Sequence, residues 1–379
     1  MRTQLAYVSD LALRLGGGGS YAVNWNAYDQ LQRRFECTYV GPVVPRPSRL
    51  EVLISRVNRK VLRRPGRFAY FSPATLSSNA QRVGRLIPLD ADAVMFRSAA
   101  RWCRAKPGVP YFVYLDAVFH TFFYNTFNPN DFLRSDIERI FEEEAAFLEN
   151  AAAVFFESRW GMHKAKDAYS LRGRQYFVVG RGGALTPPEA DTWDGRSRDL
   201  VTVAMNFSQK GGDVVLEAFK KLKPRVPDLS WRIVGGPPPA GTDRIAGISY
   251  EGFLDPGKAH DRARLEKILS SAFLLLHPTR EDTSPLVITE AAYFGCPAIS
   301  VNRFAIPELI THGVTGILLE SPAADVIADA VADLIANETR YRDMRKNARA
   351  YSLANSSWDK VGASIGNTIE PMISAVSAQ

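Results

Sequence analysis

Short apolar runs alternate with stretches of helical periodicity along most of the chain, which is the pattern of parallel strands buried between helices. The runs that we expect to form strands fall into two sets, Leu5–Val8, Thr38–Val40, Ala93–Phe96, Tyr111–Leu115 and Val154–Glu157 in the first, and Leu200–Ala204, Trp231–Val234, Phe273–Leu276 and Cys296–Val301 in the second. The segment Arg181–Asp199 between the sets is rich in glycine and proline, as linkers are. The pattern predicts two α/β domains, and 379 residues suffice for two cores.

One strand–loop–helix unit in the second set has the features of an anion site. Its strand ends at Leu276, and either Thr283 or Ser284 is a good N-cap for a helix with Pro285 in its first turn. Gly295 suits a left-handed stop at the other end of that helix. The first N–H groups of a helix have no partner inside it and attract anions, above all phosphate. The sequence therefore predicts a phosphate-binding corner here.

Charged side chains surround this corner. Arg280, Glu281 and Asp282 lie in the loop that enters the helix, and Glu290 lies two turns into it. Carboxylates accept hydrogen bonds from hydroxyl groups, so a phosphate-binding helix end with carboxylates beside it suits a sugar nucleotide. An ordinary α/β unit with a solvated acidic loop is the alternative explanation of the same residues.

Composition limits the class of protein. The hydrophobic fraction of 46% and the charged fraction of 23% are those of a soluble globular protein. The three cysteines are far apart and indicate neither a disulfide framework nor a zinc site. Met1–Asp10 is too polar and short for a signal peptide, and no apolar run approaches transmembrane length, so we expect a cytoplasmic protein. The net charge of +7 suits anionic partners: nucleotide diphosphates, a membrane surface or nucleic acid.

The acidic loop and helix resemble the acid-x7-acid signature of the retaining glycosyltransferases of family 4, which have the GT-B fold. Glu290, followed by Ala291, falls on the second acidic position. Asp282 stands eight residues earlier, where the family usually has Glu, and Glu281 is a rival one place out of register. The resemblance implies that Glu290 binds the ribose of a nucleotide donor, and that Asp282 or Glu281 binds the sugar hydroxyls.

A second resemblance lies in the loop after Leu200–Ala204. The family grips the donor diphosphate there with a Lys that precedes a Gly, and with an Arg five residues before that Lys. Lys210 matches, but Met205 stands where the Arg would be, so half of this clamp is absent. Arg280 or Arg181 is the candidate to replace it. The implied ligands of the diphosphate are Lys210, Arg280 and the helix amides near Thr283 and Ser284.

Two features of the first half match the family less closely. Gly16–Gly19 is a glycine run between a strand and a helix, which by itself is most simply a flexible turn. The resemblance makes Gly17 and Gly18 donor-site candidates. Asp116 follows a buried strand at a position where the family often has His, and His120 lies four residues on. Either side chain could take or position an acceptor proton, whereas a helix-capping Asp and a packed His are the structural alternatives.

Residues 50–67 combine apolar helical spacing with a cationic face. Six of the twelve residues from Arg56 to Arg67 are Arg or Lys, and none is acidic. Three interpretations compete: a helix that covers its own sheet with a solvated outer face, an interfacial helix on anionic lipid, and a nucleic-acid surface. No aromatic platform accompanies the charge, so we predict no nucleic-acid partner and hypothesise peripheral contact with an anionic membrane.

The chain also contains one Asp-x-Asp sequence, Asp90-Ala91-Asp92. In the other large glycosyltransferase fold such a motif holds manganese. Here it lies just before the predicted strand Ala93–Phe96, where a solvated turn is the better interpretation. We therefore predict no metal site and no cofactor.

The resemblance implies a GT-B enzyme whose two Rossmann-like, doubly wound α/β domains face each other across a cleft. We expect an acceptor-side domain at residues 1–185, a nucleotide-sugar domain at 199–357, and a C-terminal helix at 358–379 that crosses back to the first domain. The implied reaction transfers a hexose-type sugar from a UDP or GDP donor to a carbohydrate or lipid-linked acceptor, with retention of the anomeric configuration and without a metal ion. We expect it to serve polysaccharide or glycoconjugate assembly at the inner face of the membrane. The sequence leaves open the donor base, the acceptor and the linkage. A GT-B-fold sugar-nucleotide epimerase and a non-catalytic binding or scaffold protein remain alternatives.

Overall fold

The computed structural model describes residues 2–16 and 18–377. The chain forms two compact units, each with its own parallel six-stranded sheet. The first unit comprises Met1–Arg14, Asn24–Gly180 and Trp358–Gln379, and the second comprises Leu15–Val23 and Arg181–Ser357. The C-terminal helix thus groups with the first unit, and the segment around the glycine run groups with the second.

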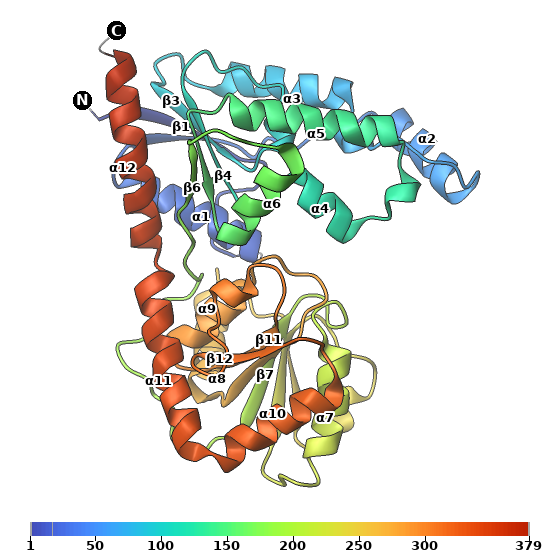
Figure 1. The fold of residues 1–379 in the computed structure, drawn as a ribbon, viewed down its shortest axis with the longest axis vertical. Coiled ribbons are helices and arrows are strands. Elements are labelled where there is room, and N and C mark those ends of the chain that lie inside the picture. Colours follow the sequence, from blue (N-terminus) through green and yellow to red (C-terminus); the bar gives the residue numbers. More distant parts are fainter. Residues whose placement is uncertain (1, 17, 378–379) are drawn as a thin grey trace. The chain divides into compact units, whose positions relative to one another are not determined.

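The sheet of the first unit has the strand order β2-β1-β3-β4-β5-β6, with every pair parallel. Its strands are β1 (Gln4–Val8), β2 (Glu36–Val40), β3 (Ala93–Arg97), β4 (Tyr111–Leu115), β5 (Ala153–Phe156) and β6 (Tyr176–Val178). The helices of this unit are α1 (Gly19–Gln32), which begins in the segment assigned to the second unit, α2 (Arg49–Lys60), α3 (Pro73–Leu86), α4 (Phe119–Thr126), α5 (Arg134–Glu149), α6 (Arg159–Tyr169) and α12 (Trp358–Ser377). Figure 1 shows α12 running beside this sheet.

The sheet of the second unit has the strand order β12-β11-β10-β7-β8-β9, again all parallel. Its strands are β7 (Asp199–Ala204), β8 (Ser230–Gly235), β9 (Ile248–Gly252), β10 (Leu274–His277), β11 (Ala298–Val301) and β12 (Gly316–Leu319). Its helices are α7 (Gly212–Leu222), α8 (Ala259–Ser271), α9 (Leu286–Tyr293), α10 (Ala324–Ala336) and α11 (Glu338–Asn355). Short 3-10 turns occur in both units, at Ala69–Phe71, Ala100–Trp102, Pro129–Asp131, Thr242–Arg244 and Ile306–Glu308.

The predicted strands are confirmed to within two residues at each end. The central strands β3, β5, β10 and β11 are buried along their whole length, because helices cover both faces of each sheet. This is why they read as continuous apolar runs rather than as alternating patterns. Two α/β units are therefore present, as the pattern predicted, and their doubly wound, Rossmann-like form is the one that the resemblance implied.

One local prediction about a helix was wrong. Neither Thr283 nor Ser284 caps α9: the helix begins at Leu286, with Pro285 at the N-cap position and no side-chain cap. Gly295 does adopt the predicted left-handed conformation, with φ of 73°. Among the acidic residues of α5, Glu144 is buried, with only 1% of its surface exposed.

Glu144 holds three helices of the first unit together. Its carboxylate accepts a hydrogen bond from the backbone N–H of Phe119 at 2.7 Å, at the start of α4, and another from the hydroxyl of Tyr169, at the end of α6. Burial disfavours the charged form and raises the pKa of Glu144 to about 7, although these hydrogen bonds act in the opposite direction. Between about pH 4.5, the ordinary pKa of a Glu side chain, and pH 7, Glu144 therefore keeps its proton in the folded protein. In the unfolded chain the same carboxyl group has lost its proton over this range.

We expect the free energy of unfolding to fall as the pH rises through this window, because the unfolded state binds fewer protons than the folded state. Glu144→Gln should flatten that dependence between pH 5 and pH 8, at about 1.4 kcal/mol per unit of pKa difference removed. Urea unfolding at both pH values measures the effect, with Glu142→Gln, an exposed carboxylate of the same helix, as the matched control. Equal slopes in the two variants would contradict the assignment.

Candidate functional site

The candidate site lies at the topological switch point of the second sheet. β7 is the first strand of this unit in sequence, yet it lies in the sheet interior between β8 and β10. Because the chain winds in opposite directions from these strands, the loops that follow β7 and β10 diverge at their carboxyl ends and leave room for a ligand. Lys210 belongs to the first of these loops, and Asp282 belongs to the second.

The loop after β7 approaches the loop after β10 closely. Gly211 caps α7 with φ of 81°, and a Cβ atom there would lie 2.3 Å from the carbonyl oxygen of Pro278. Only glycine fits this position without moving the second loop. Arg280 N–H donates to the carbonyl of Gln209 at 2.9 Å, and Gln209 Nε2 donates to Glu281 Oε2 at 2.6 Å. The two loops therefore form one hydrogen-bonded structure.

A Lys–Asp–His cluster lies at the centre of this structure. Lys210 Nζ donates to Asp282 Oδ2 at 2.7 Å and to the carbonyl oxygen of Glu281 at 2.7 Å. His277, the last residue of β10, places Nε2 3.3 Å from the same Asp282 oxygen. Burial would raise the pKa of Asp282, but the His277 hydrogen bond and the charge of Lys210 outweigh it and lower this pKa to about 2. Asp282 is therefore ionised at neutral pH.

Glu290 is the second carboxylate of the site. It lies on the second turn of α9, is 8% exposed, and accepts a hydrogen bond from Ala184 N–H at 2.8 Å through Oε1. Burial raises the pKa of Glu290, and the Ala184 hydrogen bond and the charge of Arg181 reduce that rise. A buried carboxylate with one oxygen held by backbone is well placed to accept hydrogen bonds from a ligand through the other.

A cavity of about 240 Å³ joins these groups. Lys210, His277, Asp282 and Glu290 provide its polar side chains. Its remaining lining comes from Gly18, Gly19, Ala22, Ala184, Val203, Ala204, Met205, Val234, Gly235, Phe253, Leu254, Pro256, Leu265, Pro285, Leu286 and Val287. An apolar cavity with a few convergent polar groups is the usual form of a small-molecule site.

The structure brings together four of the residues predicted from sequence, since Gly18, Lys210, Asp282 and Glu290 line one cavity. Gly18 has φ of 111°, and a Cβ atom there would meet no neighbour within 4 Å, so the conformation rather than crowding favours glycine. Gly17 lies outside the described residues.

The other candidates in the second unit do not line the cavity. Arg280 makes a bidentate pair with Asp213, at 2.8 and 2.7 Å, and also donates to the carbonyl of Ser208. The Glu281 carboxylate is occupied by Gln209. Thr283 and Ser284 lie just before α9 without facing the cavity. Their roles in donor binding stay predictions.

Asp116 and His120 belong to the first unit. Asp116 follows β4, is exposed, and accepts a hydrogen bond from the N–H of Ala117 at 2.8 Å. His120 lies in the first turn of α4 among the rings of Tyr124, Phe141 and Tyr169. Burial and the charge of Lys164 lower the pKa of His120. Their assignment to the acceptor side also stays a prediction.

Sequence reasoning missed two contributors to the site. His277 was not assigned a role, although it ends a buried strand at the switch point, and a His in that position is a recognisable signal. The backbone N–H of Ala184 could not have been found, because a linker residue that donates from its main chain carries no side-chain signature. The described residues contain no group of three or more His, Cys, Asp or Glu placed to hold a metal ion.

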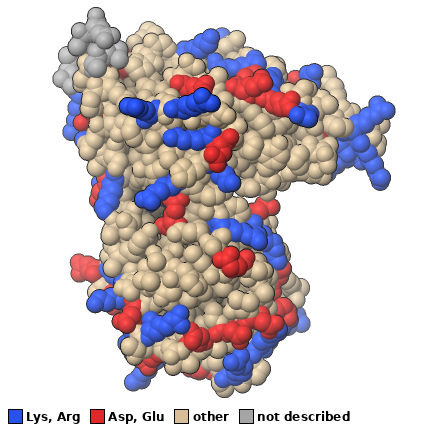
Figure 2. All heavy atoms as spheres, in the orientation of Figure 1, with Lys and Arg blue, Asp and Glu red and all other residues tan. Residues whose placement is uncertain are grey.

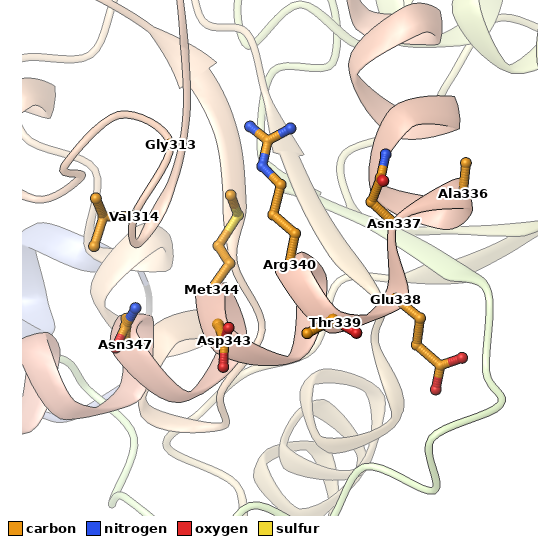
Figure 3. Close-up of a pocket in the computed structure, with 10 residues that line it drawn as sticks. All are labelled: Gly313, Val314, Ala336, Asn337, Glu338, Thr339, Arg340, Asp343, Met344 and Asn347. Atoms are coloured by element: carbon orange, nitrogen blue, oxygen red, sulfur yellow. The ribbon is translucent and has the colours of Figure 1, made fainter.

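Figure 3 shows another hollow in this unit, of about 770 Å³, where α10 passes into α11. It is lined by Gly313, Val314, Ala336, Asn337, Glu338, Thr339, Arg340, Asp343, Met344 and Asn347. Arg340 is already paired with Asp333, and the polar side chains point in different directions rather than toward one point. None of the predicted site residues lines it, so it is not the candidate site.

Residues 188–351 match the family model described as "Glycosyl transferases group 1". A GDP-mannose-dependent alpha-(1-6)-phosphatidylinositol monomannoside mannosyltransferase of Mycobacterium tuberculosis is 27% identical over 46% of this chain and 47% of its own length. A D-inositol 3-phosphate glycosyltransferase of Corynebacterium glutamicum is 27% identical over 59% of each chain. The chain thus spans about half the length of the curated relatives it matches.

Solved structures resemble nearly the whole chain. Sucrose-phosphate synthase from Thermosynechococcus elongatus superposes with a TM-score of 0.69 at 16% identity, covering 99% of this chain and 100% of its own. Anabaena HepE in complex with UDP gives a TM-score of 0.65 at 15% identity, covering 98% of this chain and 100% of its own. At these identities the likeness shows the fold alone. The protein has the GT-B fold.

Proposed function

We propose that the protein is a retaining glycosyltransferase that moves a sugar from a nucleoside diphosphate to a carbohydrate or lipid-linked acceptor. The observation that carries the proposal is the Lys210–Asp282 pair beside buried Glu290, in one cavity at the switch point of the second sheet. A cation for the diphosphate and carboxylates for the hydroxyls are the two kinds of group that a sugar nucleotide requires.

In this proposal Lys210 neutralises the donor diphosphate, and the backbone N–H groups at the start of α9 add to the positive field there. Glu290 accepts hydrogen bonds from the ribose hydroxyls through the oxygen that Ala184 leaves open. Asp282 is a better candidate than Glu281 for the sugar hydroxyls, because it lines the cavity while Gln209 occupies the Glu281 carboxylate.

The proposed transfer requires no protein nucleophile. The acceptor oxygen forms a bond to the anomeric carbon on the face from which the diphosphate leaves, the bond from that carbon to the phosphate oxygen breaks, and the acceptor's proton passes to the leaving phosphate. The protein's contribution is to hold both substrates and to stabilise the growing negative charge. Lys210 carries that role here, and we propose that the transfer needs no metal ion.

The relatives support this substrate class. Their names specify mannosyl transfer from GDP-mannose to a phosphatidylinositol monomannoside and glycosyl transfer to inositol 3-phosphate, and the structural neighbour HepE was solved with UDP and with UDP-glucose. We propose a UDP or GDP sugar as donor, an acceptor used in glycoconjugate assembly, and a place of action at the inner face of the membrane.

A thermal-shift series with UDP, GDP, ADP and TDP sugars tests the donor. A ligand at one hundred times its Kd stabilises the state that binds it by about 2.7 kcal/mol, which corresponds to roughly 5–10 °C for a domain of this size. We expect such a rise with one UDP or GDP sugar, and product analysis with the donor alone then separates transfer from epimerisation. No rise with any of the four classes would contradict the proposal.

A further inference from the structure

Helix α2 is attached to the first unit by its polar side. Ser55 is buried, and its hydroxyl donates to the carbonyl of Arg67 at 2.6 Å. The hydroxyl of Ser72 donates to the Glu51 carboxylate at 2.9 Å, and the Arg59 guanidinium lies 4.9 Å from the centre of the Phe132 ring. These contacts fix which face of the helix points away from the protein.

The outward face is apolar. Its residues recur at helical spacing and are largely exposed, namely Leu50 (64%), Leu53 (56%), Ile54 (51%), Val57 (37%) and, just after the helix, Val61 (71%). An amphipathic helix of a globular protein normally turns such a row toward the core. The interpretation of α2 as a helix that covers its own sheet is therefore wrong, and the exposed row requires another explanation.

Positive charge flanks this row. Arg49, Arg56 and Lys60 follow one edge of it, and Arg63, Arg64 and Arg67 continue past the helix end. No acidic residue occurs between Glu51 and Asp90. In the described part of the chain Arg56, Lys60, Arg63, Arg64 and Arg67 form no ion pair with a carboxylate, and Figure 2 shows Lys and Arg side chains gathered over the end of this segment.

A hollow with aromatic residues in its lining borders the loop that follows α2. The loop after the helix pairs with the 131–133 segment through its backbone. Gly66 N–H donates to the carbonyl oxygen of Asp131, and Leu133 N–H donates to the carbonyl oxygen of Gly66, each at 2.9 Å. An open hollow of about 510 Å³ borders that junction, lined by Pro65, Phe123, Tyr124, Pro129, Asn130, Phe132, Leu133, Arg134, Ile137, Glu138 and Phe141. Tyr124 is 52% exposed. Aromatic rings of this kind are frequent at the level of lipid headgroups.

We propose that α2 lies flat on an anionic lipid bilayer, with the row from Leu50 to Val61 in the headgroup region and the flanking Arg and Lys side chains on lipid phosphates. The charge identifies the occupant. Unpaired Arg and Lys side chains border the apolar row, and the one acid of the helix, Glu51, lies on the attached side with Ser72, so the outward face is complementary to anionic lipid. A protein held in this way would meet an acceptor in the membrane. That consequence rests on the proposed function, whereas the docking of α2 does not. Among the described residues, no helix combines the length and apolar character needed to cross a bilayer.

Flotation of the full chain with vesicles tests the docking surface without any transfer reaction. Vesicles of phosphatidylcholine with phosphatidylglycerol should bind the protein, and vesicles of phosphatidylcholine alone should bind it much less. Each basic residue near such a surface contributes roughly a fivefold gain, so R56Q/K60Q should weaken binding by roughly 25-fold. L53Q/I54Q should weaken it at least about tenfold, because exposed apolar side chains supply the rest.

The matched control is K267Q/K346Q, which removes two exposed charges from α8 and α11 of the second unit and should leave flotation unchanged. Urea unfolding of every variant, compared with that of the unmodified protein, shows that each one is folded, and stabilisation by the nucleotide sugar is measured separately. Equal flotation with both kinds of vesicle, or an equal loss in the control, would overturn the proposal. So would an L53Q/I54Q variant that changes only the sedimentation coefficient, because the face would then join two copies of the chain. If nucleotide sugars fail to bind while flotation behaves as expected, the proposed function is wrong and the docking surface stands.

Discussion

Replacing Lys210 with alanine should lower the turnover of sugar transfer roughly ten- to a thousandfold, the range seen when one preorganised donor to a developing negative charge is removed. The leaving diphosphate gains charge as its bond to the sugar breaks, and Lys210 is the one Lys or Arg among the described residues that line the cavity. Since this charge grows in the transition state, the loss should fall mainly on kcat. Initial rates at saturating donor, with the acceptor varied, measure it.

Lys210 also forms an ion pair with Asp282, so the controls must separate the structural effect of losing this pair from the loss of catalysis. Without Lys210, His277 is the one side chain among the described residues that still donates to Asp282, so some loss of stability is expected. Lys210→Arg retains the charge and should retain more turnover than Lys210→Ala. Lys221→Ala, which removes an exposed lysine from the last turn of α7, should leave turnover unchanged. Near-normal turnover in Lys210→Ala would show that the charge of another residue stabilises the leaving group.

The strands and their division into two sheets could be predicted from sequence because burial on both faces leaves a direct trace. Runs such as Val94–Phe96 and Leu274–Leu276 contain no polar residue, as is typical of a parallel strand that is covered on both faces. The family resemblance assigned Lys210 and Asp282 to one donor site, and the structure supplies the physical reason. Their loops follow β7 and β10, which are neighbouring parallel strands whose carboxyl ends meet at one edge of the sheet.

The direction in which a helix turns its apolar or acidic face could not be predicted, because it depends on contacts with residues far away in the sequence. The spacing of Leu50, Leu53, Ile54 and Val57 specifies an apolar face but not its direction, and the direction is set by contacts that Ser55 makes with Arg67 in a following loop. Glu144 illustrates the same limit.

Glu144 follows exposed Glu142 in an acidic stretch of the sequence, but two distant donors hold Glu144 inside the fold. Likewise Arg280 is a plausible phosphate ligand by position, and only the folded structure pairs it with Asp213.

Replacing Glu290 with glutamine should weaken donor binding roughly ten- to a hundredfold, which is the loss expected for one hydrogen bond to a charged group. The amide keeps an oxygen for Ala184 N–H but lacks the charge that makes the carboxylate a strong acceptor of ribose hydroxyls. Calorimetry with the nucleoside diphosphate measures the affinity directly. Unchanged affinity would contradict the ribose role.

The stability of the same variant distinguishes a binding residue from a structural one. Burial raises the pKa of Glu290, so ionisation of this group costs the ligand-free fold free energy at neutral pH. Glu290→Gln removes that cost and should therefore leave the ligand-free protein at least as stable at pH 8, measured by urea unfolding, while the donor affinity falls. A residue that served only to hold Ala184 would show the opposite result, with lower stability and unchanged affinity. A carboxylate kept in the fold at the expense of stability is what a binding role at the switch point requires.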